Sequence, residues 1–228
     1  MKNTILIYCI LFLLLFMGGK VKAQDWPNLN KYQNENTKLA PPETGKKRIV
    51  FIGDSITEMW STTNPSFFSG KPYINRGIGG QTTPQILVRF RADAIALQPA
   101  VIVLLAGIND IAGNTGPSTI EMISDNIFSM AELAKANQIK VILCSVLPAF
   151  DFYWRQGLEP VEKIVTLNKM ICEYADAHAI LYLDYYSALV DEQKGLNPIY
   201  SEDGVHPNIL GYQVMAPLAQ EAIRLALK

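Results

Sequence analysis

The chain has 228 residues, of which 49% are hydrophobic, with 20 Lys and Arg residues against 21 Asp and Glu residues and a formal net charge of −1. This length suits a single domain with a substantial core. A nearly neutral chain without a basic run argues against nucleic acid as a partner.

The first 23 residues have the pattern of a secretory signal peptide. Lys2 precedes an apolar run from Ile5 to Met17, and the segment ends at the small residue Ala23. A positive start, an apolar centre and a final small residue are typical of such peptides. The run is shorter than the roughly 20 residues of a membrane-spanning helix. We therefore expect cleavage after Ala23 and a secreted or periplasmic protein with no stable membrane anchor, the alternative being an uncleaved anchor.

Residues 24–47 are predicted to form an N-terminal helix and a linker. Apolar residues between Trp26 and Leu39 recur at roughly helical spacing. Asp25 can cap this helix and Pro27 suits its first turn, whereas the Pro41-Pro42 pair ends the pattern. The main domain then spans residues 48–228.

From Arg48 onward, apolar runs alternate with helical patterns. The strand candidates are 48–53, 72–77, 100–107, 140–148 and 180–186, and the helix candidates are 56–62, 83–97, 118–136, 160–177 and 209–227. Three of the strand candidates are nearly continuous in Val, Ile and Leu, as expected for strands that are covered on both faces. The alternation predicts an α/β fold with a central parallel sheet of about five strands between layers of helices.

The residues that follow the strand candidates are the first place to look for a site, because ligands bind beyond the carboxyl ends of such strands. The run "RIVFIG" is followed by Asp54 and Ser55, and "NRGIGGQTT" carries Gly79 and Gly80. Asn109 follows the third strand candidate. Ser55, at a strand-to-helix turn, can cap the helix and also act as a nucleophile.

A serine nucleophile needs a base, and the chain has two histidines. His178 lies at a predicted helix end, where its ring can meet the last carbonyl groups. His206 lies three residues after Asp203, so this carboxylate can hold one ring nitrogen and leave the other for Ser55. The alternative is that Asp203 and His206 form an ordinary turn that caps the last helix.

Three groups can stabilise a developing oxyanion: the Ser55 amide at a helix N-terminus, the Gly80 amide and the Asn109 side chain. The alternative for Gly79 and Gly80 is that they only form a tight turn, and the alternative for Asn109 and Asp110 is that they only cap the next helix. Other chemistries fit less well, because the chain has no G-x-S-x-G or G-x-x-x-x-G-K-[ST] motif. Two separated histidines and no paired cysteines do not suit zinc, so we predict no metal and no cofactor. Pairing of Cys144 with Cys172 stays open.

Four sequence blocks, "FIGDSIT", "NRGIGGQTT", "LLAGIND" and "DGVHPN", resemble in order those of the SGNH hydrolases, also called the GDSL esterase/lipase family. The resemblance runs from about Arg48 to the C-terminus. Within the family, the motifs look closest to the α-type catalytic subunits of intracellular platelet-activating-factor acetylhydrolase and to exported bacterial carbohydrate acetylesterases.

The resemblance implies a flavodoxin-like three-layer α/β/α sandwich and a serine esterase without a cofactor. It implies Ser55 as the nucleophile, Asp203 and His206 as the acid and base, and an oxyanion hole formed by Ser55, Gly80 and Asn109. Gly79 lies one position away from Gly80, and an ungapped match could select it instead.

The substrate is less well defined by the sequence. Tyr153 and Trp154, in the aromatic segment 149–159, together with Trp60 and Asp54, are the candidate substrate-binding residues. Export and the resemblance favour removal of O-acetyl groups from a carbohydrate, with a small-molecule or glycan ester as the partner. The alternatives are a lysophospholipase or thioesterase acting on longer acyl chains, and an inactive glycan-binding module. The oligomeric state stays open.

Overall fold

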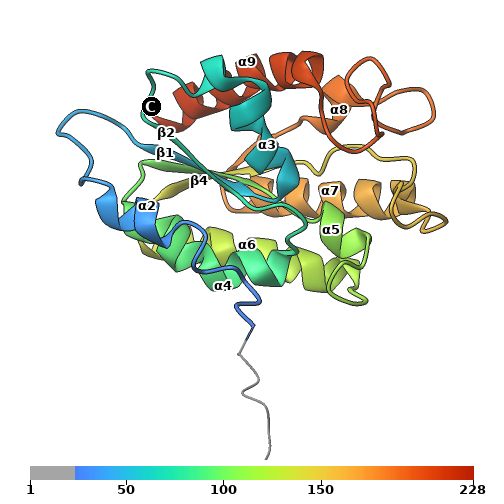
Figure 1. Cartoon of the computed structure of the whole chain (residues 1–228), viewed down its shortest axis with the longest axis horizontal. Helices are drawn as coiled ribbons and strands as arrows, with labels where there is room; N and C mark the ends of the chain where they lie inside the picture. Colours follow the sequence, from blue (N-terminus) through green and yellow to red (C-terminus); the bar gives the residue numbers. More distant parts are fainter. Residues whose placement is uncertain (1–23) are drawn as a thin grey trace, which may run out of the picture.

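The computed structural model describes residues 24–228, so the predicted signal peptide lies outside the described residues. A single parallel sheet runs through the centre of the domain (Figure 1), in the order β2-β1-β3-β4-β5. Its strands are β1 (Ile49–Gly53), β2 (Tyr73–Gly77), β3 (Val101–Leu105), β4 (Lys140–Cys144) and β5 (Leu181–Leu183). The predicted α/β fold, with a parallel sheet of about five strands, is confirmed.

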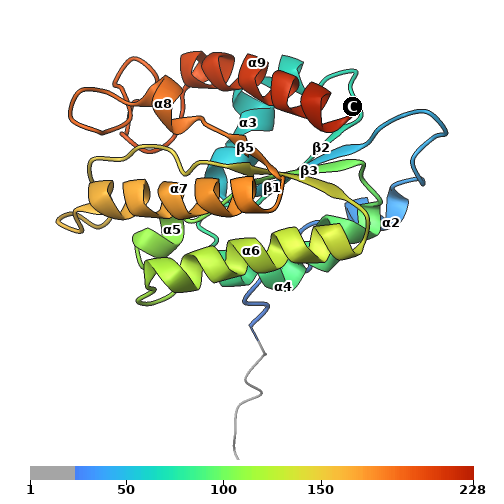
Figure 2. The same cartoon turned by 180° about the vertical axis from the view of Figure 1, so that it is seen from behind.

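Helices cover both faces of the sheet (Figures 1 and 2). One layer holds α3 (Ser55–Thr63), α8 (Tyr186–Leu189) and α9 (Ile209–Ala226). The other holds α4 (Thr83–Asp93), α6 (Ile120–Ala136) and α7 (Pro160–Ala177), and α2 (Gln33–Lys38) and α5 (Ile108–Ile111) lie on the same side. Within residues 24–228, no helix is both long enough and apolar enough to cross a membrane.

The strand order is that of flavodoxin-like sheets, in which the chain reverses its direction of winding between β1 and β3. Ligands of such folds bind at this point, beyond the carboxyl ends of the strands. Ser55 directly follows the end of β1 and Asn109 follows the end of β3. The topology therefore brings these two residues to the same edge of the sheet.

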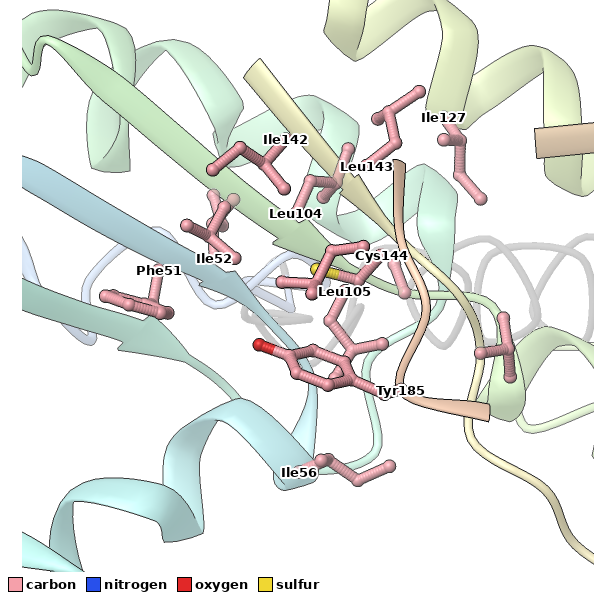
Figure 3. Packing of buried hydrophobic residues seen from close by; sticks show 14 of the residues in the cluster. Phe51, Ile52, Ile56, Leu104, Leu105, Ile127, Ile142, Leu143, Cys144 and Tyr185 are labelled. Carbon is pink, nitrogen blue, oxygen red and sulfur yellow. The ribbon is translucent and has the colours of Figure 1, made fainter. Parts of the chain in front are cut away.

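The central strands are buried because both faces of the sheet are covered. Figure 3 shows Ile52, Leu104 and Ile142 from three neighbouring strands, with Ile127 on one side of them and Tyr185 on the other. All five of these side chains are buried. Each such aliphatic side chain contributes about 1.5–3 kcal/mol when it is fully removed from water.

Several predicted boundaries differ from the structure. The predicted N-terminal helix is reduced to α2, and the Asp25 carboxylate instead accepts the amides of Leu29 and Asn30 in an earlier turn. The helix predicted over 83–97 divides into α4 and a short 3₁₀ turn, Ile95–Leu97.

The last strand, predicted over 180–186, ends at Leu183. The amides of Tyr185 and Tyr186 donate to the Ser145 hydroxyl instead of to a neighbouring strand, at 2.9 and 2.8 Å. A side chain therefore takes up the backbone donors of the second and third residues after this strand.

Two glycines at strand ends allow α3 to pack directly against the sheet. A Cβ atom at Gly77 would lie 2.1 Å from the Glu58 backbone nitrogen, and one at Gly53 would lie 2.2 Å from the Leu105 carbonyl oxygen. A larger residue at either position would push away the helix or the neighbouring strand. The position of α3, and of Ser55 in its first turn, depends on this close approach.

Candidate active site

Ser55 is the first residue of α3, and Asp54 rather than Ser55 is its N-cap. The Asp54 Oδ1 atom accepts the Ile56 N–H at 3.0 Å. The prediction that Ser55 caps the helix is therefore wrong, and its hydroxyl is free for another partner. Its amide lies in the first turn of the helix, where N–H groups lack intrahelical acceptors and the helix dipole favours negative charge.

The Ser55 hydroxyl is hydrogen-bonded to His206, with Oγ and Nε2 2.9 Å apart. The other ring nitrogen, Nδ1, lies 2.7 Å from Asp203 Oδ2. A neutral ring that donates its Nδ1 proton to this carboxylate presents the Nε2 lone pair to Ser55. This is the arrangement that a serine nucleophile, its base and an orienting acid require.

Backbone donors hold the Asp203 carboxylate in place. Its Oδ1 atom accepts the amides of Val205 and His206 at 2.9 and 2.7 Å. Burial raises the pKa of Asp203, but the hydrogen bonds from His206 and Val205 outweigh burial and hold this pKa below its ordinary value. The group is therefore ionised near neutral pH, as an orienting carboxylate must be.

The last helix does not use Asp203 or His206 as its cap. Asn208 caps α9, since its Oδ1 atom accepts the amides of Leu210 and Gly211. On the same helix, the Tyr212 hydroxyl donates to the Ile56 carbonyl at 2.7 Å. This bond ties α9 to the first turn of α3, and so fixes the loop that carries His206 relative to the helix that carries Ser55.

Gly80 and Gly79 differ in what their amides do. The Gly79 N–H donates to Glu58 Oε2 at 2.6 Å, so it is already occupied. Gly80 lines the cavity in front of Ser55, and its N–H has no acceptor within the described part of the chain. Gly80 has φ +74°, a conformation that glycine adopts without strain. Of the two glycines, Gly80 is therefore the one whose amide is available to a bound oxyanion.

Asn109 is buried, and both the nitrogen and the oxygen of its side-chain amide are hydrogen-bonded. Its Nδ2 group donates to the Gln81 carbonyl at 3.1 Å, and its Oδ1 accepts from Asn114 Nδ2 at 2.8 Å. An amide group has two N–H bonds, so one stays available. Asn114 also accepts the indole N–H of Trp154 at 3.2 Å. The sequence reasoning missed Asn114, which lies in a Gly-Asn-Thr-Gly run five residues after Asn109.

These groups surround one open cavity of about 260 Å³. Its lining consists of Ser55, Gly80, Asn109, Asn114, Tyr153, Trp154 and His206. Tyr153 and Trp154 are 59% and 38% exposed, and the Trp154 ring centre lies 6.5 Å from that of His206. Within residues 24–228, no aliphatic side chain lines this cavity, so its lining lacks the apolar groove that a long acyl chain would need.

Two predicted substrate-binding residues lie elsewhere. Trp60 is 2% exposed and stacks on Phe67, with ring centres 4.5 Å apart, so it belongs to the core. Asp54 is 1% exposed and does not line the cavity. The expectation that these two side chains contact substrate is therefore wrong. Trp60 follows Ile56 by four residues, the spacing of one helix face, and that face packs on the sheet.

Two buried carboxyl groups lie behind the cavity. Burial raises the pKa of Asp54 to about 7, and burial raises that of Asp110 to about 6 although Thr83 donates to it. The Asp110 carboxylate accepts the Thr83 amide and its hydroxyl, the latter at 2.6 Å. This links α5, which carries Asn109, to the start of α4.

The remaining predicted groups lie outside this cavity. His178 Nδ1 lies 2.8 Å from the Tyr174 carbonyl oxygen in the last turn of α7, which confirms the predicted position of this ring near the last carbonyls. Cys144 and Cys172 are both free. Among residues 24–228, no cluster of three or more His, Cys, Asp or Glu side chains has a geometry that could hold a metal ion.

Comparison with known proteins gives a consistent result. The sequence profile of the GDSL-like Lipase/Acylhydrolase family matches residues 51–214. That range includes every residue that lines the cavity, together with Asp203. In Bacillus subtilis strain 168, the lipoprotein YqeF, which is uncharacterised, is 24% identical over 148 residues. The match covers 63% of this chain and 58% of that relative.

Solved structures extend the comparison. A candidate acylhydrolase from Bacteroides fragilis is 49% identical, with a TM-score of 0.88 over 90% of this chain and 100% of that chain. A GDSL-like lipase from Bacteroides thetaiotaomicron is 50% identical, with a TM-score of 0.86 over 88% of this chain and 98% of that one. An acetylxylan esterase from Geobacillus stearothermophilus shares the fold, at 19% identity and a TM-score of 0.62 over 81% of this chain and 96% of that chain.

Proposed function

The chain belongs to the GDSL-like Lipase/Acylhydrolase family, and on that premise we propose that it is an exported serine esterase that removes short acyl groups, above all O-acetyl groups, from carbohydrate. One observation carries the proposal: the hydrogen-bonded series Ser55, His206 and Asp203 opens into a cavity that Gly80 and Asn109 also line.

The proposed reaction passes through an acyl-enzyme. His206 takes the Ser55 proton as Oγ attacks the ester carbonyl carbon, and the oxyanion accepts the amides of Ser55 and Gly80 and the free Asn109 N–H. Collapse of this intermediate breaks the bond to the alcohol oxygen, which receives the proton from His206. His206 then takes a proton from water, whose oxygen attacks the acyl carbon. Collapse of this second intermediate breaks the bond to Ser55 Oγ, which receives the proton from His206, and the carboxylic acid is released.

The cavity supports a short acyl group. A volume of about 260 Å³, bounded by polar groups and two aromatic rings, offers little apolar wall to a long alkyl chain. Burial of each methylene contributes about 0.8 kcal/mol, and a chain left in water gains none of it. This lining supports the proposed preference for acetyl over longer acyl groups.

The exposed rings support a carbohydrate as the group that carries the ester. Tyr153 and Trp154 present aromatic surface at the mouth of the cavity, next to His206. Amphipathic rings of this kind suit the apolar face of a sugar. The signal-peptide pattern of residues 1–23 supports a substrate outside the cytoplasm, and the acetylxylan esterase with the same fold offers an analogy at the level of the fold.

The test measures hydrolysis of p-nitrophenyl esters from acetate to a long acyl chain by the protein spanning residues 24–228. Acetate is expected to react fastest, and Ser55→Ala is expected to lose about 10⁶-fold in kcat. The matched control is Ser61→Ala, the same change on the same helix, because within residues 24–228 the Ser61 hydroxyl bonds only to the Glu58 carbonyl. Faster cleavage of long chains would favour a lysophospholipase or thioesterase, and an inert wild type would favour a glycan-binding module.

A second measurement tests the carbohydrate. Tyr153→Ala is expected to raise KM for an acetylated xylo-oligosaccharide several-fold and to leave KM for p-nitrophenyl acetate unchanged. Phe150→Ala is the control, because Phe150 is 60% exposed on the same segment and does not line the cavity. Equal effects of the two substitutions would contradict a role of Tyr153 in binding the sugar.

A further inference from the structure

The loop that presents Gly80 is held from outside the catalytic centre by a segment near the start of the described chain. We call residues 26–32 the strap and residues 78–82 the oxyanion loop. In Figure 1 the strap is the blue segment that leads into α2, on the α4 side of the molecule. We propose, building on the proposed function, that the strap orients the oxyanion loop and that Glu58 is the positioning residue through which it acts on Gly80.

Glu58 connects the strap to the loop. Its Oε2 atom accepts the Gly79 N–H at 2.6 Å, and its Oε1 atom is paired with the Lys31 ammonium group. The next peptide along the chain carries the Gly80 N–H, the proposed oxyanion donor. The Gly79 N–H lies on the peptide between Ile78 and Gly79, so its bond to Glu58 fixes the peptide from which the Gly80 peptide extends. Glycine has no side chain that could fix this position instead.

The geometry leaves little space around this contact. A Cβ atom at Gly79 would lie 3.0 Å from Glu58 Oε2 and 3.8 Å from Ser55 Cβ. The Gly79 backbone therefore lies against the first turn of α3, between Glu58 and the nucleophile. A hydrogen bond to a carboxylate is about twice as strong as one between neutral groups, which suits it to holding one peptide orientation.

Further bonds join the strap to this region. The buried Gln81 side chain donates to the Pro27 carbonyl at 2.7 Å, and the Gln81 backbone carbonyl accepts from Asn109. The Tyr32 hydroxyl donates to the Gly77 carbonyl, just before the loop. Burial raises the pKa of Tyr32 to about 12, so this hydroxyl keeps its proton at neutral pH. Both proposed oxyanion donors outside α3 are thus linked to the strap.

A positioning role can be separated from a contribution to stability. Lys31 and Glu58 are each about one-third exposed, and ion pairs of this kind contribute about 0–1 kcal/mol to folding. The oxyanion develops in the transition states and is absent from the bound ester, so a misplaced donor lowers kcat and kcat/KM together and leaves KM unchanged. A purely structural contact would instead lower the unfolding temperature.

The experiment compares Glu58→Ala, Glu58→Gln and the matched control Glu221→Ala. Glu221 forms an exposed ion pair with Arg224 on α9 and contacts no part of the oxyanion loop. With p-nitrophenyl acetate, we expect Glu58→Ala to lower kcat about 10- to 100-fold, which is part of the 10²–10³-fold loss on removal of a donor. Glu58→Gln keeps an acceptor for the Gly79 N–H but loses the ion pair with Lys31 of the strap, so its kcat is expected to lie between those of Glu58→Ala and wild type. A wild-type kcat in Glu58→Gln would show that the strap does not act through Glu58, and the control is expected to match wild type.

Hydrogen exchange gives a readout that does not depend on activity. A peptide covering the oxyanion loop is expected to exchange at least about tenfold faster in Glu58→Ala and at the wild-type rate in Glu221→Ala. Unchanged exchange of this peptide in Glu58→Ala would overturn the proposal that the strap holds the oxyanion loop through Glu58. Faster exchange with unchanged kcat would overturn its positioning role. A wild type inert towards every ester would overturn the proposed function and with it the catalytic meaning of the strap, even with the exchange difference present.

Discussion

Asp54 gives the folded protein a stability that depends on pH in an unusual direction for an aspartate. Its carboxyl is buried, Oδ1 caps α3, and Oδ2 has no hydrogen-bond partner within residues 24–228. Burial raises its pKa from 3.8 to about 7 in the folded state. The folded protein therefore binds this proton more tightly than the unfolded chain does. The stability contribution is fully present below the unfolded pKa and is lost as the pH rises through the folded pKa.

The magnitude follows from the size of the shift. A shift of one pKa unit corresponds to about 1.36 kcal/mol, so a rise of about three units costs about 4 kcal/mol once the group is ionised in both states. Asp54→Asn keeps an acceptor oxygen for the Ile56 amide and removes the ionisable proton. The free energy of unfolding of wild type, relative to Asp54→Asn, is expected to fall by about 4 kcal/mol between pH 4 and pH 8.

Urea unfolding at a series of pH values, followed by tryptophan fluorescence, measures this difference. The informative quantity is how the difference in free energy of unfolding between wild type and Asp54→Asn changes with pH. A part of this difference that does not change with pH arises from placing an amide where the carboxyl was. Asp125→Asn makes the same chemical change at an exposed position of α6 and is expected to show no such slope. A wild-type to Asp54→Asn difference that stays level from pH 4 to pH 8 would refute the reasoning.

Three further predictions follow from the site. Asp203→Asn removes the carboxylate that selects the His206 tautomer and should lower kcat about 10⁴-fold in ester hydrolysis, and a loss below tenfold would contradict this role. Asn109→Ala should lower kcat about 10²–10³-fold at unchanged KM, whereas a rise in KM alone would indicate ground-state binding. Gly77→Ala places a Cβ 2.1 Å from the Glu58 backbone nitrogen and should cost about 3 kcal/mol, a fall of roughly 6 to 12 °C in Tm by calorimetry, and an unchanged Tm would exclude the clash.

Much of the fold was predictable because its signals are local. Near-continuous aliphatic runs mark strands that are covered on both faces, and β1, β3 and all of β4 except Lys140 are buried in this way. The helix predicted over 160–177 has the boundaries of α7, since Pro160 suits a first turn. Predictions were poorer where a side chain ends an element, as Ser145 does when it takes up the amides that follow β5.

The candidate site was predictable in its parts but not in its assembly. The three-residue spacing of Asp203 and His206 indicates that they can touch, because it is a local relationship. The contact between Ser55 and His206 joins residues 151 positions apart. Its distance depends on the strand order and on the Tyr212 bond between α9 and α3, neither of which periodicity specifies. Asn114 was missed because a turn asparagine has the same pattern whether or not it supports a site.

Arg89 illustrates what no pattern in the sequence could show. It lies on α4, is fully buried, and is paired with Asp93 at 3.2 Å. Its guanidinium group donates to the carbonyl oxygens of Gly53 and Arg76, both at 2.8 Å, and to Gln81 Oε1 at 2.5 Å. A buried ion pair is weak evidence for stability, because desolvation offsets the attraction. The hydrogen bonds that Arg89 donates instead fix the end of β1, the end of β2 and the oxyanion loop that follows β2. A single buried cation therefore sets the relative positions of the Ser55 turn and the oxyanion loop.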